Sequence, residues 1–166
     1  AAGIGAAETI RRMEPSAQIL AITEEVHGYY SRPGLAYYLT REMPEQQLFP
    51  FCEKDFRRLR LRPFVARVIH IDTSSHLIQL QDGKMVPYDR LLIATGATAT
   101  QAKVPGSQLE GVVKLDNLDD AYRIAKLARQ TRSAVVVGGG ITALEIVEGL
   151  RARGVKTHYF LRRARY

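Results

Sequence analysis

The stretch VVVGGGITALEIVEGLRARG, residues 135–154, is the most informative part of this sequence. Consecutive valines of the kind found in buried parallel strands lead into a run of glycines, and apolar residues then recur at helical spacing. We predict a strand over residues 133–137, a turn at Gly138–Gly140 and a helix over residues 141–153. Gly154 suits the C-terminal cap of that helix.

The turn has the spacing Gly-x-Gly-x-x-Ala between a strand and a helix, which is the pattern of a dinucleotide-binding fingerprint. Gly138 permits a tight turn, Gly140 lets the backbone approach a pyrophosphate, and Ala143 keeps the helix close to the strand. The helix N-terminus offers unpaired N–H groups and a positive dipole end to phosphates. A glycine turn that binds no ligand is the alternative interpretation.

A second glycine pattern opens the chain as AAGIGAAETIRRMEP, residues 1–15. Aligning Gly3 with the first fingerprint glycine places Glu8 opposite Ala143, where a glutamate would push the helix away from the sheet. Aligning Gly3 with Ala143 instead pairs Glu8 with Glu148. We therefore interpret Gly3 as the last glycine of a second fingerprint, and we expect its strand and first two glycines to precede the sequence.

The remaining elements follow from apolar spacing and turn residues. We predict a helix over residues 3–13 and a buried strand over residues 18–22. The aromatic, proline-containing segment from residue 29 to residue 51 is interpreted as a loop with a short helix around residues 35–39. A helix over residues 117–129 is expected to start at the N-cap Asn117.

Residues 65–72 and 76–80 are rich in strand-forming residues, and Asp82-Gly83 is a hairpin-turn signal. We also predict a buried strand over residues 90–94 and a final strand over residues 158–161. Strands that alternate with helices predict the α/β class with parallel sheets, here with an inserted β-hairpin or meander.

Two further segments carry a family resemblance. YDRLLIATGA, residues 88–97, is similar to the ATG motif, and YYSRPGLAYYL, residues 29–39, is similar to a YxRPxLS segment. With the two glycine fingerprints in the same order, the chain resembles the flavin-dependent pyridine nucleotide–disulfide oxidoreductase superfamily. The resemblance is to the branch of nitrite reductase-type, rubredoxin reductase and ferredoxin reductase flavoproteins.

This resemblance implies Rossmann-like, three-layer FAD- and NAD(P)-binding domains. Residues 1–103 would form an FAD-binding domain that lacks its first strand and its C-terminal part. Residues 104–166 would form the first part of an NAD(P)H-binding domain, with Lys103–Gly106 as a linker.

The resemblance also assigns cofactor-binding roles. For FAD, Gly3 would close the pyrophosphate turn, Glu24 or Glu25 would bind the adenosine ribose, and Val68 would lie beside the adenine. The remaining expected FAD contacts are Arg32 with Pro33, at the phosphates or the flavin edge, and Thr95 with Gly96. Glu24 and Glu25 as plain surface carboxylates, and Arg32 as a structural ion-pair partner, are the alternatives.

For the second nucleotide, Gly138, Gly140 and Ala143 would bind the NAD(P)H pyrophosphate, and Glu145 would lie near the nicotinamide. An acid that would bind both ribose hydroxyls of NADH is expected where Leu161 stands, and Arg162 follows it. Because an arginine can accept a 2′-phosphate, we favour NADPH over NADH. Surface arginines without a ligand are the alternative.

The implied activity is an FAD-dependent NAD(P)H oxidoreductase. Hydride would pass from the nicotinamide to the flavin, and electrons would then pass to a small acceptor such as a rubredoxin- or ferredoxin-like protein. The single cysteine, Cys52, excludes the CxxxxC pair of the disulfide-reducing branch. Tyr37 replaces the lysine that many ferredoxin reductase-type members carry near the flavin. The alternative function is a nucleotide-binding module or fragment that does not retain flavin.

The composition of the chain argues against binding of nucleic acids, membranes or metal ions. The chain of 166 residues is 46% hydrophobic and 25% charged, and its formal net charge is +7. Arginines cluster over residues 57–62 and 151–165, but no nucleic-acid-reading motif accompanies them, so we interpret them as solvated faces. No apolar run is long enough to span a membrane and no metal-ligand spacing is present. We expect a cytoplasmic protein that binds no nucleic acid or membrane and whose full-length form can oligomerise.

Overall fold

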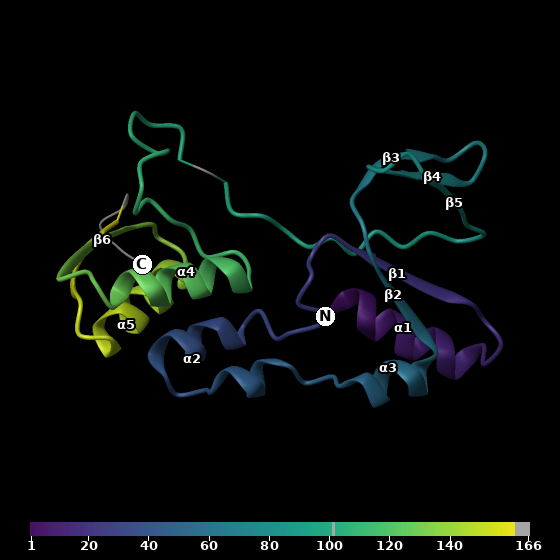
Figure 1. Cartoon of the computed structure of the whole chain (residues 1–166), viewed down its shortest axis with the longest axis horizontal. Coiled ribbons are helices and arrows are strands. Elements are labelled where there is room, and N and C mark those ends of the chain that lie inside the picture. The colour runs from purple at the N-terminus through teal and green to yellow at the C-terminus, as the bar shows by residue number, and fades with distance from the viewer. Residues whose placement is uncertain (101, 162–166) are drawn as a thin grey trace. The chain divides into compact units, whose positions relative to one another are not determined.

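A computed structural model describes residues 1–100 and 102–161 of the chain (Figure 1). The chain forms two compact units. The first contains residues 1–29 and 51–96, and the second contains residues 30–50 with the chain from residue 97 onward. These units divide the chain by its internal packing, so the expected boundary between cofactor domains at residues 103/104 stays a prediction.

The first unit contains a parallel pair of strands covered by helix α1. Strand β1 pairs with strand β2 from Ile19 opposite Leu61 to Thr23 opposite Val65. Ala7 of α1 is buried in one cluster with Leu59 and Leu61, and Ile4, Ile19 and Ala21 pack against this cluster (Figure 1). The bounds are α1 (Ala2–Met13), β1 (Ile19–Thr23), α3 (Glu53–Leu59) and β2 (Leu61–Val65).

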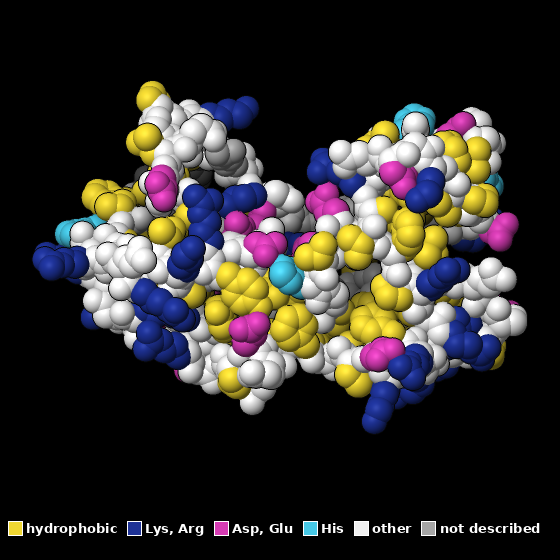
Figure 2. Space-filling model, viewed as in Figure 1, with side chains coloured by type: hydrophobic (Ala, Val, Ile, Leu, Met, Phe, Trp, Pro, Cys, Tyr) yellow, Lys and Arg dark blue, Asp and Glu magenta, His cyan; other side chains and the backbone are white. Residues whose placement is uncertain are grey.

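Helix α3 and strand β2 were not predicted. Their arginines stand on the surface, where Arg57 pairs with Glu53 and Arg58 lies 3.6 Å from Asp55. Figure 2 shows Lys and Arg side chains gathered over α3. Pro63 in β2 is tolerated because β2 is an edge strand of this two-stranded sheet, where a missing N–H need not break a ladder.

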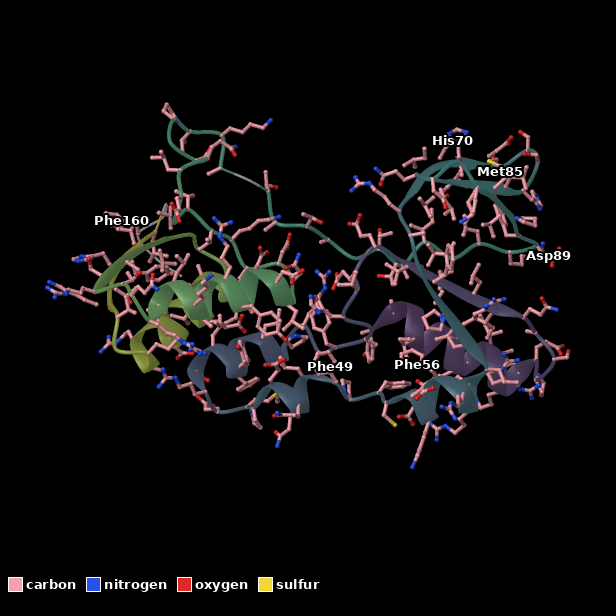
Figure 3. All side chains as sticks on the ribbon, in the orientation of Figure 1. Phe49, Phe56, His70, Met85, Asp89 and Phe160 are labelled. Atoms are coloured by element: carbon pink, nitrogen blue, oxygen red, sulfur yellow. The ribbon has the colours of Figure 1, made fainter. Side chains whose placement is uncertain are left out.

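The expected strands that follow form a separate antiparallel meander. Its strands are β3 (Val68–Asp72), β4 (Leu77–Leu80) and β5 (Met85–Pro87). Gly83 adopts a φ of +86°, as a hairpin turn between β4 and β5 requires, so the turn predicted at Asp82-Gly83 is confirmed. The labelled His70 and Met85 mark β3 and β5 in Figure 3.

The strand predicted over residues 90–94 is wrong. In the described chain this segment has no strand hydrogen-bonding, and Leu92 and Ile93 are 60% and 65% exposed. A strand forms only when a neighbour takes up its backbone N–H and C=O groups. None of the described strands lies beside this segment as a pairing partner, so its apolar composition alone does not make it a strand.

The second unit is built around the fingerprint. Strands β6 and β7 pair in parallel from Ser133 opposite Lys156 to Val137 opposite Phe160, so the predicted strands are confirmed. Gly154 adopts a φ of +80° directly after the α5 C-cap. The bounds are α2 (Gly34–Thr40), η1 (Glu45–Leu48), α4 (Leu118–Ala128), β6 (Ser133–Val137), α5 (Ile141–Ala152) and β7 (Lys156–Phe160).

Helix α4 begins as its sequence predicts. The Asn117 side chain accepts a hydrogen bond from the backbone N–H of Asp120 at 2.9 Å, which satisfies a donor of the first turn. The face that carries Leu118, Ala121 and Ile124 is buried. The α/β class with parallel strands and an inserted meander is therefore confirmed. No helix of the described residues is long and apolar enough to cross a membrane.

Candidate nucleotide-binding sites

The fingerprint turn is closed between two strands and a helix. The N–H of Gly138 donates to the carbonyl of Phe160 at 3.1 Å, which joins the turn to the end of β7, where Figure 3 labels Phe160. A Cβ on Gly138 would lie 3.0 Å from the Cβ of Ala143. Glycine at the first position and a small residue at the last are therefore both required by close packing of α5 against the turn.

The outer side of the same turn is open. A Cβ placed on Gly139 or Gly140 would meet no atom within 4 Å. Gly140 caps α5, and the first turn of α5 contains no acidic residue that would repel an anion. These residues fit a pyrophosphate group, which needs a close backbone, helix N–H groups and positive potential.

Of the other expected NAD(P)H contacts, the structure describes Glu145 and Leu161 but not Arg162. Glu145 is half-buried on α5, two residues after Ala143. Leu161 follows the last residue of β7 and is 39% exposed, so an apolar side chain stands where a ribose-binding acid was expected. Arg162 lies outside the described residues.

On the flavin side, Gly3 lies in the first turn of α1. A Cβ on Gly3 would be 3.6 Å from the Cβ of Ala94, so the start of α1 adjoins the residues that lead into Thr95 and Gly96. Gly96 has a φ of +73° and open space around it, so its backbone is accessible to a large ligand. The structure thus brings three of the expected FAD contacts into one region of the first unit, and these residues fit a dinucleotide.

Helices α1 and α5 also bear on the alignment of the two glycine patterns. Both helices are twelve residues long. Aligning Gly3 with Ala143 superimposes them to within one residue, whereas aligning Gly3 with Gly138 displaces one helix from the other by several residues. The helix bounds therefore favour the interpretation of Gly3 as a final fingerprint glycine.

The two candidate ribose-binding acids follow β1 directly. Glu24 forms an exposed ion pair with Arg67, with 3.1 Å between Oε2 and Nη1. The N–H of Glu25 donates to the Thr23 hydroxyl at 3.2 Å, which forms a turn at the end of the strand. Val68, the expected adenine neighbour, starts β3 immediately after Arg67. Glu24 therefore lies beside the residue that leads into Val68.

Arg32 and Pro33 belong to the second unit. Nη1 of Arg32 donates to the backbone carbonyl of Asp116 at 3.0 Å, and Pro33 is the N-cap of α2. Arg32 therefore bonds a protein carbonyl, and its guanidinium is exposed. Its FAD contact stays a prediction.

Asp116 is a hydrogen-bonding partner of Arg32 that the sequence did not reveal. Its oxygens accept from the N–H of Ala99 and from Nζ of Lys114, and its own N–H donates to Asp120. Burial raises the pKa of Asp116, but the hydrogen bonds from Lys114 and Ala99, with the nearby charge of Arg32, hold it below its ordinary value. An aspartate just before an N-cap is too common a pattern to signal this role.

Comparison with known proteins identifies the family. The family model described as pyridine nucleotide-disulphide oxidoreductase matches residues 1–166. The chain belongs to this family. Its members are oxidoreductases that bind FAD and NAD(H).

Two relatives of the family are similar over most of the chain. The ferredoxin–NAD(+) reductase component of the 3-phenylpropionate/cinnamic acid dioxygenase of Photorhabdus laumondii is 31% identical over 150 residues, which cover 87% of this chain and 37% of that protein. The rubredoxin-NAD(+) reductase of Pseudomonas putida is 29% identical over 147 residues, with 87% and 38% covered. The chain therefore spans under two fifths of the length of these relatives.

A solved structure of the family gives the same result in three dimensions. The crystal structure of a ferredoxin reductase from Rhodopseudomonas palustris has a TM-score of 0.88 and 28% sequence identity. The similarity covers 95% of this chain and 39% of that one. The predicted Rossmann-like architecture of the family is thereby confirmed for the described part of the chain.

Proposed function

We propose that this chain supplies nucleotide-binding parts of an FAD-dependent NAD(P)H oxidoreductase. The observation that carries the proposal is the fingerprint turn. Gly138 is held against Ala143 and hydrogen-bonded to β7, while the outer side of the turn and the N-terminus of α5 stay open. When both cofactors are bound, the nicotinamide supplies a hydride and the flavin accepts it.

The chain's own residues would bind and orient these cofactors. Gly138 and Gly140 would place backbone next to the pyrophosphate of NAD(P)H, and Glu145 would lie further along α5 near the nicotinamide. On the flavin side, Gly3 and Gly96 would allow close approach of backbone to FAD. Positioning is the main contribution of the protein to such a reaction, so no side-chain nucleophile is required.

Arg32 would bind FAD phosphates or the flavin edge. Its guanidinium is exposed and offers a planar set of donors that suits oxygen acceptors. Glu24 or Glu25 would bind the adenosine ribose, and Glu24 also pairs with Arg67 at the end of β1. A fall in flavin affinity for Glu24→Gln or Glu25→Gln is the expected result, and the larger fall would identify the ribose-binding acid.

The electron acceptor would be a small carrier protein. This part of the proposal comes from the relatives, whose names specify ferredoxin and rubredoxin. The NADPH preference suggested by Leu161 and Arg162 has no support from these relatives, which are named for NAD(+), so it stays a prediction with its own test. A cytoplasmic location likewise stays a prediction.

Rapid mixing of the full-length protein with NADH or NADPH tests the proposal, with the flavin absorbance followed over time. We expect the flavin to be reduced by at least one of the two nucleotides. Nucleotide binding without reduction would support a binding module without turnover instead. Absence of both binding and reduction would refute the proposal.

A further inference from the structure

Helix α2, which follows Arg32 and Pro33, packs inside the fingerprint unit. It lies against α5 and α4 (Figure 1). Leu39 of α2 is 1% exposed and shares one core with Ala143 and Leu150 of α5. The helix that follows the proposed flavin-contact residues is therefore part of the same packed body as the helix that follows the fingerprint turn.

The two helices approach each other through a glycine. A Cβ on Gly149 of α5 would lie 2.7 Å from the Cβ of Leu39 and 3.4 Å from its carbonyl carbon. These atoms belong to the backbone or stand next to it, so they cannot move aside as the end of a flexible side chain can. The approach of α2 to α5 is thus defined by the absence of a side chain at residue 149.

Arg153 holds the end of α2 at this contact. Its Nε donates to the carbonyl of Leu39 at 2.8 Å and its Nη2 donates to the carbonyl of Tyr38 at 3.0 Å. The guanidinium also lies over the Tyr38 ring, 5.8 Å from the ring centroid. The last carbonyls of a helix lack partners within the helix, and a cation there also interacts favourably with the helix dipole.

The residues on either side of α2 are hydrogen-bonded to α4. The hydroxyl of Tyr30 accepts from the N–H of Leu118 at 3.1 Å, and the hydroxyl of Tyr122 donates to Glu45 at 2.6 Å. Arg32 thus lies between Tyr30, which is hydrogen-bonded to α4, and the start of α2. The C-terminal end of α2 is held by Arg153. The segment has little freedom to move independently of α4 and α5.

We propose that Arg153 is a positioning residue for the redox reaction. By holding the C-terminal carbonyls of α2 on α5, it fixes Arg32 in register with the fingerprint turn at Gly138–Ala143. Arg153 touches neither cofactor in this scheme and acts through α2. The inference rests on the proposed function, because it gives Arg32 a role at the flavin.

The test compares Arg153→Ala with a matched control, Arg151→Ala, in the full-length flavin-loaded protein. Arg151 lies in the last turn of the same helix and is exposed. The readouts are the dissociation constant of the nucleotide and the rate of flavin reduction at saturating nucleotide. We expect Arg153→Ala to slow reduction about tenfold, since a displacement near 1 Å has effects up to about 100-fold, with nucleotide affinity within about twofold of wild type.

Arg153→Lys should restore part of the rate, because one ammonium can bond one of the two carbonyls. If Arg153→Ala does not fold, the lysine variant carries the test with the same split between rate and affinity. Equal rates for the Arg153 and Arg151 variants would overturn the positioning role. A parallel loss of affinity and rate would overturn it too, because that result marks a purely structural residue. Absence of flavin reduction in the wild type would refute the proposed function itself.

Discussion

The backbone N–H of Ala99 is hydrogen-bonded to both carboxylate oxygens of Asp116, at 2.8 and 2.9 Å. The same carboxylate accepts from Nζ of Lys114 at 2.8 Å, and the Asp116 side chain is only 14% exposed. Because the backbone carbonyl of Asp116 also accepts from Arg32, one residue joins Arg32 to the segment around Ala99 within the second unit. Of these two, the family resemblance assigns Arg32 to FAD.

Replacing Asp116 by alanine should destabilise the protein. The change removes the acceptor of the exposed Ala99 N–H and one of the two acceptors of the Lys114 ammonium, and the loss of such hydrogen bonds costs about 0.5–1.5 kcal/mol. Asp116→Asn keeps an acceptor oxygen and should cost less. Urea unfolding of both variants measures the difference; equal stability of Asp116→Ala and wild type would contradict it.

The same carboxylate predicts a pH dependence. Burial raises the pKa of Asp116, but hydrogen bonds from Lys114 and Ala99 lower it more, so the folded pKa lies below the unfolded value. The resulting stabilisation is complete above the unfolded pKa, about 3.9, and is lost as the pH falls through the folded pKa. As the pH falls below about 4, wild type should therefore lose more free energy of unfolding than Asp116→Asn. Parallel pH profiles would argue against this contribution.

A single methyl group should disrupt the contact between α2 and α5. In Gly149→Ala the new Cβ would come within 2.7 Å of the Leu39 Cβ, and overpacking of this kind costs about 1–3 kcal/mol. Gly5→Ala is the matched control, because Gly5 lies in α1 with no atom within 4 Å of an added Cβ. Alanine there should stabilise the helix by up to about 1 kcal/mol. The opposite signs can be measured by chemical unfolding, and a stabilising effect of Gly149→Ala would contradict the close contact of α2 with α5.

Local sequence patterns were sufficient to predict some elements of the fold but not others. Residues 133–160 were predictable because the valine strand, the glycines and the helical spacing all indicate the same unit, and the Asn117 cap is equally local. The segment 53–65 was missed because its arginines indicate a charged surface and Pro63 argues against a strand. The packing of α2 on α5 depends on the space beside Gly149, and a sequence does not report distances between segments over 100 residues apart.

The fingerprint turn predicts different outcomes for two adjacent glycines. In Gly138→Ala the added Cβ would lie 3.0 Å from the Ala143 Cβ, so α5 must move away from the turn that faces the pyrophosphate. Gly139→Ala adds the same atom into open space. We expect nucleotide affinity to fall about tenfold for Gly138→Ala, which corresponds to about 1.4 kcal/mol, and to change little for Gly139→Ala. Titration of the nucleotide by calorimetry tests this, and similar affinities for the two variants would refute the assigned turn geometry.

The choice of nucleotide can be tested at the residue after β7. Leu161 offers no hydrogen-bond acceptor to a ribose hydroxyl, whereas a glutamate there would accept from both hydroxyls of NADH and repel a 2′-phosphate. Leu161→Glu should therefore raise the ratio of kcat/KM for NADH over NADPH by about tenfold or more, since hydrogen bonds to charged groups contribute about 1.5–3 kcal/mol. Arg162→Ala should shift the ratio in the same direction by weakening NADPH alone. Lys156→Ala, at the opposite end of β7, serves as the control and should leave the ratio unchanged. An unchanged ratio in Leu161→Glu would show that the ribose is recognised elsewhere and would remove the basis for the NADPH preference.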